Sequence, residues 1–336
     1  MICYGGYVRR RGTKIAPKSR TVSPIQPAGC RETLCFPAST GILNRCPIRR
    51  WPLSLWGLPM LVSLLPPIPR EHGAWFMMYV PLLIPTIAYG AQSGGAVFLL
   101  GMAITSLFFG QSLLRLTIRR RRISLLNGVW LGVCCILCLA GFASLILVHG
   151  FRDLLVIAAI GSVLCAGYAG LWLVRTRRLD RSVWGEILAA VTLSLSAPAA
   201  CVIAQGKLEA SAIIIWGMCA VYFASGVLYV NMLIQAGKSR DPLQTAQKWL
   251  TGCPVLVYHS SLLIGAIALV TSISVWAVWL VCLAYAPVII RAFWGWVTLS
   301  NVTPTLSRVG AMEAIYALWF LVFLAAAVKT VLPTIL

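Results

Sequence analysis

The stretch Pro69-Arg70-Glu71-His72-Gly73-Ala74-Trp75 separates a cationic, irregular leader from an almost wholly apolar remainder. It places two ionisable side chains, Glu71 and His72, about one turn before an apolar run that continues to Tyr89. Ionisable groups at the edge of hydrocarbon are costly and usually have a partner. Two interpretations follow. Glu71 caps a helix while Trp75 joins an aromatic belt, or both ionisable groups belong to a polar site.

The composition of the 336-residue chain is that of a polytopic membrane protein, because 60% of its residues are hydrophobic and only 11% are charged. The net charge of +20 would suit nucleic acid. However, the Lys and Arg residues lie in the leader and in short clusters between apolar segments, and they build no basic face on a soluble domain. We therefore expect an all-α integral membrane protein with no nucleic-acid partner.

Residues 1–59 form the leader, which carries ten Lys or Arg against a single acid, Glu32. It has no periodicity that would build a core. It is either a targeting segment or an over-extended reading frame whose true start is Met60. Residues 60–336 are expected to form one transmembrane helical domain.

About nine apolar segments follow the leader, each close to the 20 residues that a bilayer requires. Their expected limits are 74–90, 95–115, 127–149, 153–174, 184–204, 212–235, 255–272, 275–297 and 311–333. Within the fifth segment, the proline-interrupted run Ser194–Ala200 predicts a kink and a close helix approach. The loop 236–254 could hold a short helix on the membrane surface.

Cations alternate sharply between the loops. Fourteen Lys or Arg residues fall in or beside the loops after segments two, four, six and eight, including Arg119–Arg122, whereas the other loops hold only Arg152 and Lys207. By the positive-inside rule, the cation-rich loops are cytoplasmic. This bias predicts an N-terminus inside and a C-terminus outside.

Polar side chains concentrate at the predicted cytoplasmic ends of the segments. Because buried ionisable groups in membranes face the bundle interior and pair, they predict a cytoplasm-facing pocket. The alternative is that each residue only marks a helix end. The pocket candidates are Glu71, His72, Arg115, Glu186, Asn231, His259, Arg291, Arg308 and Glu313.

Three carboxylates and three arginines of this set share one predicted depth, which predicts mutual ion pairs. The first expected pair is Glu313 with Arg291, because segments eight and nine are joined by a short loop. His259 and His72 are the groups that would change charge near neutral pH.

Several motifs resemble the YwiC-like membrane protein family over about residues 69–335. Asn231 departs from the pattern, where the family would be expected to carry Arg. The resemblance implies the fold, the topology and a bacterial inner-membrane location, but no activity. The matching motifs are Pro69–Trp75, Trp184–Glu186 leading to Leu195–Ala200, Leu228–Asn231, Tyr258–His259, Ala286–Arg291 and Arg308–Glu313.

The architecture is also similar to that of UbiA-type intramembrane prenyltransferases. Their metal-dependent chemistry needs acidic clusters after spans two and six, whereas this chain has five arginines after the second segment and only Asp241 after the sixth. We expect no cofactor and no metal. The expected partner is a membrane lipid or lipid-like small molecule, amphipathic or anionic. A degenerate prenyltransferase-like enzyme and a small-solute or proton-coupled carrier are the alternatives, and no motif decides whether the protein is an enzyme.

The cation bias gives a testable topology. Cysteine labelling in intact cells should report position 120 or 178 as cytoplasmic and positions 94 and 274 as external. Labelling of position 120 from outside would overturn the orientation.

Overall fold

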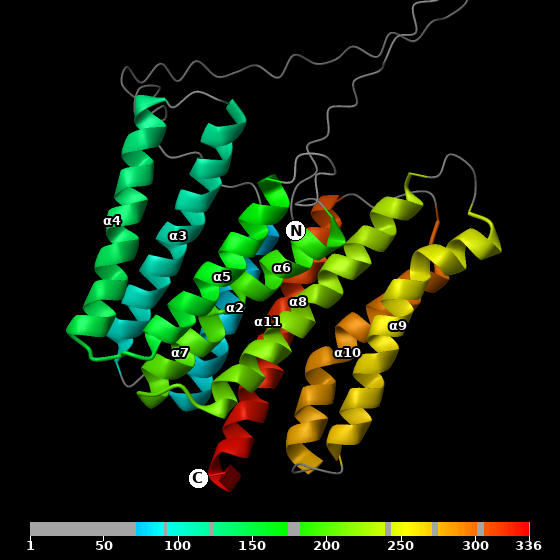
Figure 1. Cartoon of the computed structure of the whole chain (residues 1–336). Coiled ribbons are helices and arrows are strands. Elements are labelled where there is room, and N and C mark those ends of the chain that lie inside the picture. Colours follow the sequence, from blue (N-terminus) through cyan, green and yellow to red (C-terminus); the bar gives the residue numbers. More distant parts are fainter. Residues whose placement is uncertain are drawn as a thin grey trace, which may run out of the picture. The chain divides into compact units, whose positions relative to one another are not determined.

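The computed structural model describes residues 72–90, 93–120, 124–173, 182–238, 243–270, 275–300 and 306–335, and these residues form helices and connecting turns without a strand (Figure 1). The leader, its boundary and Glu71 lie outside the described residues. The helices are α2 (His72–Tyr89), α3 (Gly94–Arg120), α4 (Leu125–Leu147), α5 (Leu154–Leu173), α6 (Val183–Leu193), α7 (Ser196–Gln205), α8 (Ala210–Ala236), α9 (Thr245–Val270), α10 (Val275–Val297) and α11 (Leu306–Ile335).

Each of the nine expected segments contains a helix, so the all-α prediction is confirmed for the described part of the chain. Six stretches there are long and apolar enough to cross a membrane, and α2 and α5 are shorter apolar helices. The protein is therefore a multi-pass membrane protein. The six stretches are Gly94–Ile118, Leu125–Leu147, Val183–Gln205, Ala210–Ala236, Trp276–Val297 and Arg308–Thr330.

Helix α9 begins at Thr245, ten residues before the expected limit of 255, and continues through Pro254, so the second half of the loop 236–254 is helical and runs into α9. A proline removes one hydrogen bond of the helix, and the rest of the helix can tolerate that loss in a membrane. Similarly, α11 begins at Leu306, five residues before the expected limit of 311.

The break in the fifth segment lies where the sequence predicts it. Helix α6 ends at Leu193 and α7 begins at Ser196. Pro198 has no N–H to donate to the carbonyl four residues earlier, which explains the interruption. The Ser196 hydroxyl donates instead to the Met78 carbonyl of α2, at 2.7 Å, and so joins the two helices.

Helix α7 is the most enclosed helix, since every residue from Ser196 to Ala204 is buried. It consists mainly of small residues and packs against α2, which also contacts α11. Small side chains allow helix backbones to approach closely. The small residues of α7 therefore let α2 pack closely against it.

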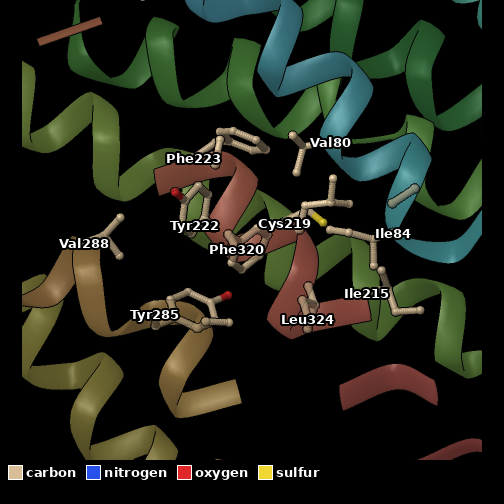
Figure 2. Close-up of a cluster of buried hydrophobic side chains, with 14 of the residues drawn as sticks. Val80, Ile84, Ile215, Cys219, Tyr222, Phe223, Tyr285, Val288, Phe320 and Leu324 are labelled. Carbon is tan, nitrogen blue, oxygen red and sulfur yellow. The ribbon is translucent and has the colours of Figure 1, made fainter. Parts of the chain in front are cut away.

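An apolar core lies where α2, α7, α8, α10 and α11 meet (Figure 2). The Tyr222 ring of α8 stacks on Phe320 of α11, with 3.8 Å between ring centroids. The Tyr285 ring of α10 meets Phe320 edge-on. These aromatic contacts hold α8, α10 and α11 together.

The contact between α3 and α4 depends on Gly141, where an added Cβ would lie 3.0 Å from Ala103 Cβ and 3.3 Å from the Leu99 carbonyl oxygen. Gly141→Leu should separate the two helices and lower the free energy of unfolding by about 1 to 3 kcal/mol, the usual cost of overpacking. Thermal unfolding in detergent measures this. Gly132→Leu is the matched control, because Gly132 of the same helix has nothing within 4 Å in the described structure. An equal loss in both variants would contradict the close contact.

Candidate functional site

Arg291 of α10 lies inside the described helices, with only 8% of its side-chain surface exposed. Its guanidinium forms an ion pair through Nη1 with Oε1 of Glu313 on α11. This is the pair expected from the short loop between the two segments. Burying a guanidinium is costly without a partner of opposite charge, so the carboxylate is needed for this placement.

Two tyrosine rings complete the surroundings of the cation. The Tyr229 ring centroid of α8 lies 4.3 Å from Arg291 Cζ, and that of Tyr316 on α11 lies 5.5 Å from it. Aromatic faces attract a guanidinium, and more strongly where water is excluded. The rings therefore replace part of the hydration that Arg291 loses.

Two glycines make room for these groups. A Cβ at Gly295 would lie 2.5 Å from Tyr229 Cε2, so a larger residue there would displace the ring. A Cβ at Gly226 would lie 3.2 Å from Oε2 of Glu313. The place of the Tyr229 ring thus depends on the lack of a side chain at position 295, and that of the Glu313 carboxylate on the lack of one at position 226.

The site retains unused hydrogen-bonding groups. Beyond the contact with Glu313, Nε and Nη2 of Arg291 have no hydrogen-bond partner among the described residues, and neither has the buried Tyr222 hydroxyl. Buried polar groups in proteins are nearly always satisfied. A free Nε–Nη2 edge is the face with which arginine binds a carboxylate or a phosphate bidentately.

His259 of α9 is fully buried next to this site, because Val255, one helical turn before it, packs in one apolar cluster with Tyr229 and with Ala292, the residue after Arg291. Its Nδ1 is 2.7 Å from the Val255 carbonyl oxygen, and its Nε2 is 2.9 Å from the hydroxyl of Ser225 on α8. A carbonyl oxygen only accepts, so Nδ1 carries the hydrogen and donates it. In the neutral ring, Nε2 accordingly accepts from Ser225.

The structure thus brings together three of the nine predicted residues, namely His259, Arg291 and Glu313. Arg115 lies elsewhere, 4.9 Å from the ring centroid of Tyr168 on α5. Asn231 is half-buried on α8.

Of the remaining four predicted residues, two lie elsewhere on described helices and two fall outside the described side chains. Glu186 is half-buried in the first turn of α6, whose N-cap Ser182 accepts a hydrogen bond from the Gly185 N–H. Arg308 is exposed in the first turn of α11. His72 begins α2, but its side chain, like all of Glu71, lies outside the described structure. The pairing of Glu186 and Glu71 with arginines stays a prediction.

Sequence reasoning missed Tyr222, Ser225, Tyr229 and Tyr316. The sequence does contain a signal for them, because these residues recur every three or four positions along a helix. Positions 222, 225, 226 and 229 lie on one face of α8, and positions 313 and 316 share a face of α11. Because these side chains are uncharged, a search for ionisable residues in the sequence does not find this face.

Nothing in the described part of the chain resembles a metal centre, because no three His, Cys, Asp or Glu side chains gather there. The site is instead a cation with aromatic neighbours, one carboxylate and a neighbouring histidine. Such an arrangement is suited to binding an acceptor group or moving a proton.

A double-mutant cycle tests the ion pair. Arg291→Gln and Glu313→Gln should each lower the free energy of unfolding by about 3 to 5 kcal/mol, because each leaves a buried charge unpaired. The double variant should cost much less than the sum of the two, as measured by thermal unfolding in detergent. The exposed pair Lys207–Glu209, 2.8 Å apart, is the control and should give additive effects. Additivity at Arg291 and Glu313 as well would mean that the two charges end their helices separately in water.

Comparisons with known proteins support the resemblance seen in the sequence. A family model described as YwiC-like protein matches residues 68–201. No curated protein and no solved structure matches the chain. The match ends within α7, before the helices that carry Arg291 and Glu313. The similarity to the YwiC-like family is therefore confirmed for residues 68–201, which include Pro69–Trp75 and end within the buried helix α7.

Proposed function

We propose that this multi-pass protein binds the polar head group of an amphipathic, lipid-like ligand at Arg291. The observation that carries the proposal is the unused Nε–Nη2 edge of a guanidinium that is more than nine-tenths buried. Buried N–H donors without acceptors cost free energy, because the hydrogen bonds to water that they lose are not replaced. An acceptor group of a ligand would replace it.

The surroundings favour a ligand with an apolar chain. Ile290 and Ile315, which flank the site residues on α10 and α11, expose 66% and 58% of their surfaces. These residues belong to stretches that can span a membrane, so their exposed faces meet hydrocarbon. A head group at Arg291 would therefore leave its chain beside lipid-facing surface.

The proposed site lies toward the end of α10 that the cation bias assigns to the cytoplasm. Arg291 is six residues from the end of α10 at Val297, and Glu313 is seven residues after the start of α11 at Leu306. At 1.5 Å per residue, both lie about 10 Å inside their helix ends. We infer that the protein has nine spans, an internal N-terminus and an external C-terminus, and that it lies in a bacterial inner membrane. In that topology the ligand would enter from the cytoplasmic leaflet.

Of the alternatives, proton-coupled transport gains support from one observation. His259 lies near the cation, and its ring bonds to a hydroxyl that can either donate or accept. Prenyl transfer without the usual acidic motifs has no comparable support among the described side chains.

The proposal is tested by the lipids that remain with the purified protein. Mass spectrometry of the detergent-extracted wild type should find an amphipathic molecule in stoichiometric amount. Arg291→Gln should reduce it about tenfold or more, because a charge-assisted hydrogen bond contributes roughly 1.5 to 3 kcal/mol.

Two further variants make the result specific. Arg308→Gln removes an exposed arginine of α11 and should retain the ligand. Arg291→Lys keeps the charge but loses the bidentate edge, so it should bind weakly while remaining folded. Equal ligand content in the wild type, Arg291→Gln and Arg291→Lys would overturn the proposal.

A further inference from the structure

The charges of the Arg291 site already balance before any ligand arrives. The guanidinium is paired with the Glu313 carboxylate, and its other neighbours, Tyr229 and Tyr316, approach it with aromatic ring faces that carry no formal charge. An anionic head group at the free edge would therefore add one uncompensated negative charge. Such a charge is expensive where water is excluded.

One neighbouring group can remove this excess by accepting a proton. His259 is the member of the cluster whose ordinary pKa lies near neutral pH. Protonation at Nε2 would reverse its bond with Ser225, whose hydroxyl would then accept where it previously donated. The bond from Nδ1 to the Val255 carbonyl would remain unchanged. The imidazole can thus become charged without losing a hydrogen bond.

The other titratable groups around His259 do not compete for this proton. Tyr258 of α9 donates its hydroxyl to the Val221 carbonyl, and Tyr285 of α10 donates to that of Met218. Both phenols are already protonated at neutral pH. Glu313 is held as a carboxylate by its contact with Arg291. Arg291 itself always carries its charge.

We propose that an anionic head group binds at Arg291 together with one proton, which His259 takes up. This inference rests on the proposed function, and it makes the occupancy of the site depend on pH. The affinity for the anion should fall as the pH rises above the range in which the imidazole of the ligand-free protein protonates. With one proton bound per ligand, the dissociation constant should increase about tenfold for each pH unit.

The probe is octanesulfonate, a single-chain amphiphile whose sulfonate keeps its charge throughout the range. Titration calorimetry of the full chain in lipid nanodiscs, between about pH 7 and about pH 9, measures its affinity above the ordinary pKa of histidine. Repeating the titration in buffers of different ionisation enthalpy gives the number of protons taken up. The expected result is about one proton per sulfonate.

Two variants identify the charges involved. His259→Gln should bind octanesulfonate without proton uptake and with an affinity that no longer varies with pH. Glu313→Gln removes the carboxylate that neutralises Arg291, so the sulfonate should bind more tightly than in the wild type and again without a proton. Arg308→Gln is the control and should behave as the wild type.

The outcomes separate this inference from the proposed function. Binding to the wild type without proton uptake would overturn the inference and leave the ligand site standing. Proton uptake that persists in His259→Gln would overturn the assignment to His259. No saturable binding to the wild type or to Glu313→Gln would instead overturn the anion site itself.

Discussion

A guanidinium withdrawn from solvent constrains the helices around it. Arg291 needs a carboxylate from α11 and ring faces from α8 and α11, and these contacts require the close approach permitted at Gly226 and Gly295. Buried ion pairs contribute little net stability, and well-packed apolar residues often serve as well or better. The pair is therefore poorly explained by stability alone, and the proposed binding of a ligand would give a reason for its presence.

The helix positions could be predicted from the sequence, whereas the lateral arrangement of the polar residues could not. A bilayer imposes a length on each apolar segment, so hydropathy alone locates nearly every helix. Distance from a helix end also predicts the depth of a side chain. Depth does not, however, tell which helices lie beside a given side chain. Arg115 and Arg291 both lie near helix ends that the cation bias predicts to be cytoplasmic, yet one contacts Tyr168 of α5 and the other Glu313 of α11.

The tyrosines near Arg291 differ from it in their hydrogen bonding, because two of them are fully paired while Nε and Nη2 of Arg291 are not. Tyr258 and Tyr285 each donate a hydrogen bond to a carbonyl of α8. Tyr222 lies between the same helices, but its hydroxyl lacks a hydrogen-bond partner in the described structure, as do Nε and Nη2 of Arg291. Backbone carbonyls of α8 thus accept from the hydroxyls of Tyr258 and Tyr285, whereas no described group accepts from the hydroxyl of Tyr222. Buried polar atoms in proteins are nearly always hydrogen-bonded, so these unpaired atoms are the observation on which the proposed ligand site rests.

The burial of α7 bears on how this protein can change in evolution. From Ser196 to Ala204 no side chain reaches the surface, so lipid cannot accommodate an increase in volume there. Helix α4 is the opposite case, with Leu125, Ile136, Leu139 and Leu147 each exposing more than 60% of its surface. Substitutions among apolar residues should therefore accumulate freely along α4, whereas α7 should change only by rare exchanges of one small residue for another.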